Sequence, residues 1–138
     1  MHSFRILEHT ADVGFEAFGE TRPQLFANAA RALTSLRVDL DSVAALEPVK
    51  LRVQGPDLPG LLVNWLSEIL YLEDAEEWLF SSFDFSAFEE TSLDGVARGE
   101  RFSPARHRLK SLVKAVTYHQ LAVEKKDGVW RARVFVDV

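Results

Sequence analysis

Two stretches of the chain have the apolar spacing of a helix, and both open with a capping residue followed by a proline. Thr21 stands just before Pro23, and Asp57 stands just before Pro59. A capping side chain accepts a hydrogen bond from a free N–H group of the first turn, and proline suits that turn because it has no N–H group to leave unpaired. Apolar residues then recur at intervals of three and four, so each helix is expected to bury a face. The predicted helices span residues 21–37 and 57–72.

Outside these helices the pattern is typical of β-strands. The alternation is clearest in 129–138, where Ala132, Val134 and Val136 share one face, and it continues to the last residue. Just before it, Asp127-Gly128 can supply the positive φ angles that a tight hairpin turn needs. The other predicted strands are 4–9, 12–18, 49–54, 78–88, 94–102 and 113–124. We therefore predict an α+β fold, a single domain over residues 1–138, in which two main helices pack on a mostly antiparallel β-sheet.

The composition narrows the class of protein. The chain has 138 residues, 47% of them hydrophobic, which is enough for a core without covalent cross-links. Cysteine is absent, which excludes disulfides, thiolate zinc sites and cysteine catalysis. The N-terminus lacks a signal-peptide pattern, and no apolar run approaches the roughly 18 residues of a membrane span. We expect a cytoplasmic protein with no membrane partner, and its oligomeric state stays open.

Charge is distributed unevenly along the chain, whose formal net charge is −5. Residues 68–94 contain nine acids and no lysine or arginine, whereas residues 98–114 contain six lysines or arginines and one acid. Two solvated faces of opposite sign are the simplest interpretation. A second hypothesis is that the acidic segment meets a basic channel of a partner.

Carboxylates near both ends of the chain are the strongest candidate site. Asp12 opens a predicted strand, and Asp137 with the terminal carboxylate of Val138 ends another. Each has a structural alternative: Asp12 could satisfy backbone donors at a turn, and Asp137 could pair with Arg131 or Arg133 on the same strand face. Together, Asp12, Asp137 and Val138 would form an all-oxygen site suited to calcium, magnesium or manganese.

Histidines and hydroxyl groups give weaker signals. His9, His107 and His119 lack a second histidine at metal-site spacing, so structural or hydrogen-bonding roles are favoured. Tyr118 and His119 could belong to a polar cluster on the predicted strand 113–124. The sequence has no Gly-rich phosphate loop, no G-x-S-x-G elbow and no nucleophile with a nearby base, so nucleophilic catalysis is disfavoured.

Several motifs, taken in order, resemble the archease family. They are His9-Thr10-Ala11-Asp12-Val13-Gly14, Gly19-Glu20-Thr21, Gly55-Pro56-Asp57-Leu58 with the helix through Leu72, Val113-Lys114-Ala115-Val116-Thr117-Tyr118-His119, and the terminal Phe135-Val136-Asp137-Val138. The resemblance covers essentially the whole chain. Two positions depart from the family pattern: Gln120 stands where a glycine usually follows, and Ser103 stands where members often have aspartate.

The resemblance implies a non-catalytic protein cofactor of the GTP- and manganese-dependent RNA ligase that seals split tRNA exons at 2′,3′-cyclic phosphate or 3′-phosphate ends. Such a protein promotes guanylylation of the ligase and its repeated turnover, and meets RNA only through the ligase. The family's metal ligands correspond to Asp12, Asp137 and Val138, with His9, Tyr118 and His119 as neighbours of the site. Calcium is the expected ion, with magnesium or manganese as alternatives.

Two other functions stay open at this point. A stand-alone metal-dependent hydrolase or nucleotide-processing enzyme would also need an acidic metal site. An RNA-binding, chaperone-like module acting through residues 98–114 would bind RNA with an affinity that falls steeply with salt.

Overall fold

Both predicted helices are present in the computed structural model, which describes residues 3–9 and 12–138 except for the side chains of residues 8 and 9. Helix α1 (Arg22–Arg37) is capped by Thr21, whose hydroxyl accepts a hydrogen bond from the N–H of Gln24 at 3.2 Å. Helix α2 (Leu58–Ala75) is capped by Asp57, whose carboxylate accepts from the N–H of Gly60 at 2.7 Å. Helix α2 runs three residues beyond its predicted end at Leu72, and the buried Glu73 lies in this extension.

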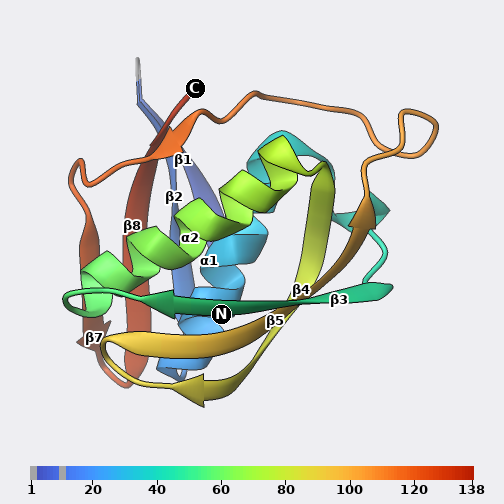
Figure 1. Cartoon of the computed structure of the whole chain (residues 1–138). Helices are drawn as coiled ribbons and strands as arrows, with labels where there is room; N and C mark the ends of the chain where they lie inside the picture. Colours follow the sequence, from blue (N-terminus) through green and yellow to red (C-terminus); the bar gives the residue numbers. More distant parts are fainter. Residues whose placement is uncertain (1–2, 10–11) are drawn as a thin grey trace.

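The strands form two sheets rather than one, and every pairing among the described strands is antiparallel. The larger sheet has the order β1-β2-β8-β6, and β7 also pairs with β8. The smaller sheet has the order β3-β5-β4. Figure 1 shows the two sheets as separate layers around the helices. The strands are β1 (Phe4–His9), β2 (Asp12–Gly19), β3 (Glu47–Gln54), β4 (Trp78–Phe88), β5 (Ser92–Arg101), β6 (Ala115–Val116), β7 (Ala122–Lys126) and β8 (Val129–Asp137), and a short 3₁₀ turn, η1 (Leu40–Ser42), follows α1.

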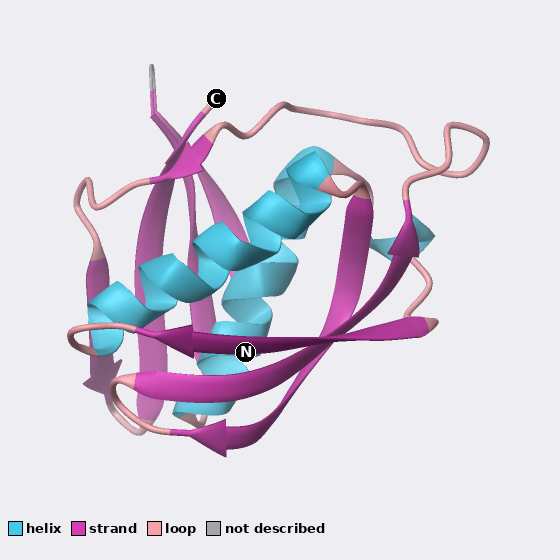
Figure 2. Cartoon of the chain, in the orientation of Figure 1, coloured by secondary structure: helices cyan, strands magenta, loops and turns pink. Residues whose placement is uncertain are grey.

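One core joins the helices to both sheets, as the helices (cyan) between the strands (magenta) in Figure 2 indicate. Helix α1 packs against β2 of the larger sheet and against β4 of the smaller one. Trp65 of α2 is fully buried, its indole N–H donates to the carbonyl of Phe26 at 3.0 Å, and its ring packs against Phe83 and Phe85 of β4. Strands β2 and β8, which carry the candidate site, therefore pack on the same hydrophobic core as the smaller sheet.

The predicted strand 113–124 is wrong as a single element. It is divided into β6 and β7, which both pair with β8 but in registers that differ by three residues. The turn between them is closed by a hydrogen bond from the N–H of Leu121 to the carbonyl of Tyr118, and Gln120 takes a positive φ of 49°. Alternating hydrophobicity cannot reveal such a turn, because Val113, Val116, Leu121 and Val123 contact the same core on either side of it.

The remaining strands differ from the predicted ranges by at most two residues at an end. The Asp127-Gly128 hairpin is confirmed, since both residues have positive φ angles, of 54° and 79°. The final strand ends at Asp137, one residue before the predicted end. No helix among the described residues is long and apolar enough to cross a membrane.

Candidate functional site

Asp12 and Asp137 lie at neighbouring positions where β2 begins and β8 ends. Val13 pairs with Val136, so the same register places Asp12 opposite Asp137 on the outward face of the sheet. Directly opposite residues of an antiparallel pair have Cβ atoms about 5 Å apart. Both side chains are exposed, and Val138 follows at once. The fold therefore brings the three predicted ligands to one edge of the larger sheet.

A glycine and a phenylalanine form the surface beside Asp12. Gly14 pairs with Phe135, and a Cβ atom at Gly14 would lie 2.7 Å from the Cδ1 atom of the Phe135 ring. Phe135 is buried although it occupies the outward face, because its ring lies over the space that a side chain at position 14 would fill. Alternation along the strand places Phe135 on the same face as Arg131 and Arg133, and this pattern does not predict its burial.

His119 packs on Phe135 and lies close to Asp12. Its ring contacts Phe135 edge to face, with 5.7 Å between the ring centroids, and its Nε2 atom lies 3.8 Å from Oδ2 of Asp12. Thr117 holds the turn in place, because its hydroxyl donates to the carbonyl of Phe135 at 2.9 Å and accepts from the N–H of His119 at 3.2 Å. The separation of Asp12 and His119 in the chain hides this neighbourhood from any local pattern.

The other two predicted neighbours of the site, Tyr118 and His9, add little to its geometry. Tyr118 is 61% exposed at the tip of the same turn. The backbone of His9 pairs with Asp12 at the end of β1, but its side chain lies outside the described part of the structure. The motif residues Thr10 and Ala11 also lie outside the described residues.

The structural alternative for Asp137 is not found in the described residues. Arg131 pairs with Glu16 and with Glu124 instead. Arg133 donates from Nε to the carbonyl of Gln120 at 3.1 Å. Both cations that share the strand face with Asp137 are therefore engaged elsewhere, which leaves the Asp137 carboxylate available for a ligand.

The donor set suits a hard divalent cation. Asp12 and Asp137 supply two carboxylates and Val138 supplies a terminal one, which is the oxygen-rich chemistry that calcium, magnesium and manganese prefer. Among the described side chains, no group of three histidines and carboxylates is close enough to hold a metal ion. The predicted set has only two carboxylate side chains, and its third member is the main-chain carboxylate of Val138. The assignment of Asp12, Asp137 and Val138 as ligands stays a prediction.

The acidic segment 68–94 does not form one acidic face. Glu73 is buried. Its carboxylate accepts from the hydroxyl of Thr34 at 2.8 Å and from the N–H of Phe80 at 3.1 Å, and its Oε1 atom lies 3.4 Å from Nη1 of Arg37. Burial raises the pKa of Glu73 to about 7, against the opposing effect of these partners. Asp84 and Asp94 pair with arginines of the smaller sheet. Within the acidic segment, Glu73 is therefore structural, and Asp84 and Asp94 are already paired at the surface.

The basic segment is anchored by a buried histidine. His107 accepts from the N–H of Ser103 through Nδ1 at 2.9 Å, so its Nε2 carries the proton and donates to Glu100 at 2.9 Å. Burial alone raises the pKa of Glu100, but hydrogen bonds from the N–H of Ala44, from His107 and from Arg106 outweigh it, so the pKa lies below its usual value. The structural role expected for His107 is therefore what the fold shows.

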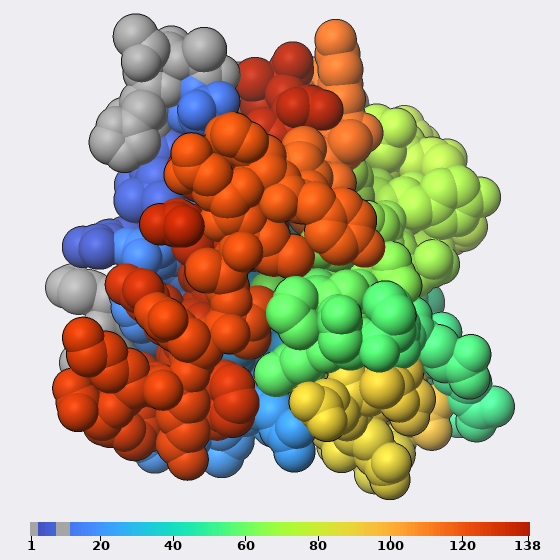
Figure 3. All heavy atoms as spheres, turned by 90° about the vertical axis from the view of Figure 1, so that its left-hand side faces the viewer, coloured from blue at the N-terminus to red at the C-terminus, as the bar shows by residue number. Residues whose placement is uncertain are grey.

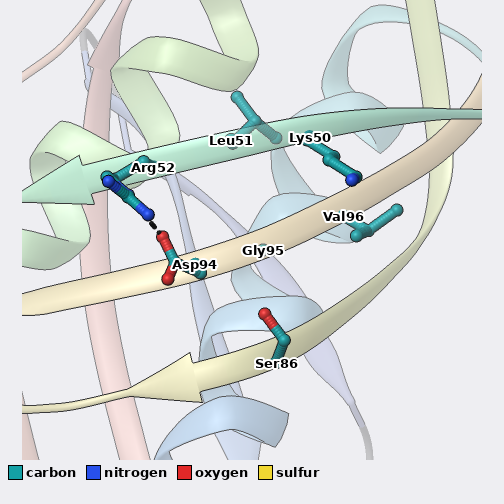
Figure 4. A pocket seen from close by; sticks show the side chains of 7 residues that line it. All are labelled: Lys50, Leu51, Arg52, Ser86, Asp94, Gly95 and Val96. Carbon is teal, nitrogen blue, oxygen red and sulfur yellow. Dashed lines mark hydrogen bonds and ion pairs between the residues drawn. The ribbon is translucent and has the colours of Figure 1, made fainter.

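A separate hollow of about 510 Å³ lies on the smaller sheet. Figure 4 shows that its side chains come from β3, β5 and β4, and that Arg52 reaches across to Asp94, with 2.9 Å between Nε and Oδ1. Among the described residues that line it, Asp94 is the only acid, and its carboxylate is already paired. The hollow therefore lacks the chemistry of the site at the Asp12 edge.

The space-filling view shows the surroundings of the Asp12 edge. There the red C-terminal residues lie beside the orange segment near residue 115 (Figure 3).

Comparisons with known proteins agree with the motifs. Residues 4–138 match the Archease protein family. The chain is similar to the archease of Methanopyrus kandleri, with 42% identity over 135 residues that cover 96% of each protein. It is similar to the archease of Methanosarcina mazei, with 40% identity over 139 residues, covering 98% of this chain and 95% of that protein. The solution structure of protein 1598 from Methanobacterium thermoautotrophicum superimposes with a TM-score of 0.86 at 35% identity, covering 100% of both chains.

Proposed function

This chain belongs to the archease family, and on that basis we propose that it is a non-catalytic activator of the GTP- and manganese-dependent RNA ligase that joins tRNA exons. In this proposal it promotes guanylylation of the ligase and restores the ligase for repeated turnover. The observation that carries the proposal is the whole-chain family match, together with the register that sets Asp12 opposite Asp137 at one exposed edge.

The proposed site is a divalent-cation site formed by Asp12, Asp137 and the Val138 carboxylate, with calcium as the expected ion and magnesium or manganese as alternatives. A bound cation would supply positive charge at an edge where two carboxylates otherwise face each other. The chain's own contribution is orientation: Phe135 on Gly14 supports the His119 ring, which lies against Asp12. Exposure of Asp12 and Asp137 leaves the site open to a partner.

Multiple-turnover ligation tests the activator role. The ligase of the same organism is held limiting with GTP and an RNA bearing a 2′,3′-cyclic phosphate end, alone, with this protein, or with its Asp12→Ala variant. We expect the wild-type protein to convert a stalled reaction into sustained ligation and Asp12→Ala to fail. Glu47→Ala, which removes an exposed carboxylate from another part of the surface, is the matched control and should activate normally.

Calorimetric titration with calcium, magnesium and manganese tests the ion site separately. Removal of one carboxylate by Asp12→Ala or Asp137→Ala should weaken binding about 10-fold or more while the melting temperature stays nearly unchanged, because both side chains are exposed. Residues added after Val138 should weaken binding as well, since they convert the terminal carboxylate into an amide. Unchanged affinity in the extended protein would remove Val138 from the ligand set.

Two other outcomes would favour the alternative functions. Hydrolysis of nucleotides by the purified protein would favour a stand-alone enzyme, and salt-sensitive RNA binding without the ligase would favour an RNA-binding module.

A further inference from the structure

Exposed apolar side chains gather at the end of the molecule that carries the carboxylates. The described residues include seven exposed large hydrophobic side chains, and five of them lie in the last part of α2, on the segment 109–118 or at the C-terminus. These five are Tyr71, Leu109, Leu112, Tyr118 and Val138. Soluble proteins seldom concentrate exposed apolar groups in this way unless the surface binds another molecule.

A backbone hydrogen bond and a shared hollow connect these residues to the carboxylate edge. The N–H of Lys114 donates to the carbonyl of Asp137 at 2.8 Å, which holds Leu112 near the end of β8. Tyr71 and Asp74 of α2 line a hollow of about 280 Å³ together with the segment 114–116. Tyr118 lies on the turn that carries His119 to Asp12. In Figure 1 the long segment between β5 and β6 runs along the same end of the molecule as the C-terminus.

The segment that bears the two leucines is held at several points. The N–H of Lys110 donates to the carbonyl of Arg37 at 2.7 Å, and its Nζ donates to the carbonyl of Ser35 at 3.0 Å, so Lys110 caps the C-terminal end of α1. Val113 is buried in the core. Leu109 and Leu112 therefore stand out between fixed points, and a partner would pay little conformational entropy to order them.

The charges beside the leucines are available for a partner. Arg106 is engaged with Glu100, and Lys110 caps the helix. Arg108 and Lys114 are exposed and have no carboxylate within ion-pair distance among the described residues. A complementary surface would thus offer an apolar pocket for the leucines, an apolar side chain for the hollow and carboxylates for the two cations.

We propose that the surface formed by Tyr71, Leu109, Leu112 and Tyr118, here the apolar end surface, is where the RNA ligase docks, an inference that rests on the proposed function. The ligase covers this surface with an apolar, acid-flanked face, and docking places the Asp12 edge against the ligase. The apolar groups supply affinity, whereas the carboxylates act on the docked ligase.

Two other occupants fit the surface less well. In a symmetric dimer through this end, the Asp12 and Asp137 carboxylates of one protomer would approach those of the other, which repel each other. Single-stranded RNA is bound by stacking on aromatic rings and by a continuous basic groove. Tyr71 and Tyr118 could stack on bases, but the leucines do not stack, and the Asp12 and Asp137 carboxylates beside the surface repel a phosphate backbone.

The experiment separates docking from activation. Binding of the immobilised ligase and multiple-turnover ligation are both measured for the wild-type protein, Leu109→Ser/Leu112→Ser, Asp12→Ala and Leu46→Ser. Leu46 is the matched control because it is 70% exposed and lies outside the surface. We expect the double variant to raise the ligase Kd about 10-fold or more with unchanged calcium affinity and melting temperature. Asp12→Ala should bind the ligase normally without activating it, and Leu46→Ser should behave as wild type.

Each outcome decides between the proposals. If the wild-type protein activates the ligase and the double variant binds it equally well, the docking surface is wrong and the proposed function stands. If the wild-type protein does not activate the ligase, the proposed function fails and the docking surface fails with it. Loss of self-association in the double variant, or loss of RNA binding with an unchanged ligase Kd, would assign the surface to another occupant and overturn the inference.

Discussion

At the scale of single residues, the backbone of Gln120 is strained, because its φ of 49° lies in the left-handed region. That conformation costs a non-glycine residue about 1–2 kcal/mol. The resemblance implied glycine at this position, and the turn geometry supplies a physical reason for that expectation. We expect Gln120→Gly to raise the free energy of unfolding by about 0.5–1 kcal/mol after the greater chain entropy of glycine is counted.

Urea denaturation measures this change, and Gln120→Ala is the control. Alanine keeps a Cβ atom and should leave the stability nearly unchanged, since Arg133 bonds the main-chain carbonyl of Gln120 and not its side chain. A gain of stability in both variants would attribute the effect to loss of the glutamine side chain and not to the turn.

Glu73 gives the stability a pH dependence with a defined sign. Its pKa of about 7 in the folded protein lies above the ordinary value of 4.5, so the folded state holds the proton more tightly than the unfolded state. Stability should therefore be greatest below pH 4.5 as far as Glu73 is concerned, fall as the pH rises to about 7, and stay level above that. The full shift corresponds to about 3 kcal/mol as an order of magnitude.

Denaturation of the wild-type protein and of Glu73→Gln across this pH range tests the assignment. The glutamine carbonyl can still accept from Thr34 and Phe80 but cannot ionise. The variant should lose the decline between pH 4.5 and pH 7. An equal decline in both proteins would mean that another group is responsible.

At the scale of elements, the connection between β5 and β6 depends on one buried cluster. His107 links the N–H of Ser103 to Glu100, and Glu100 also accepts from the N–H of Ala44. Removal of the imidazole in His107→Ala leaves a cavity and unpaired buried groups. We expect a loss of about 2–4 kcal/mol and faster amide hydrogen exchange in residues 102–114.

The same cluster has its own pH window. The pKa of Glu100 lies below 4.5, so its contribution is present above pH 4.5 and is lost as the pH falls through the lowered value. For the loss of stability in His107→Ala, the control variant is Asp84→Asn, because the pair between Asp84 and Arg98 is exposed at the surface and should contribute little.

The exchange measurement has its own contrary outcome. Slow amide exchange in residues 102–114 of His107→Ala would show that other anchors, such as Lys110, suffice to hold the segment.

At the scale of the whole molecule, the two sheets should unfold together. Helix α1 packs on both of them, and Leu33 is fully buried in the core that they share. We expect Leu33→Ala to cost about 2–5 kcal/mol and to shift the tryptophan-fluorescence and far-UV circular-dichroism transitions equally. Leu46→Ala, at an exposed leucine, should shift neither. Separate transitions for the two probes would contradict a single cooperative unit.

The helices and the final hairpin were predictable from the sequence because their signals are local. Thr21 and Asp57 cap the turns that directly follow them, and Asp127-Gly128 closes a turn within its own two residues. The family resemblance and the importance of Asp12 and Asp137 were also accessible, since they rest on motifs that can be read in order.

The amino-acid sequence by itself thus determined the α+β class, the two helices and the carboxylates at the ends of the chain. Only the tertiary structure decided that two sheets form, that the strand near residue 118 is broken, and that His119 reaches Asp12 across Phe135 and Gly14. The physical reason is that capping and alternation act between near neighbours in the chain. Strand register and side-chain packing, in contrast, join segments that are far apart in sequence and meet only when the core forms.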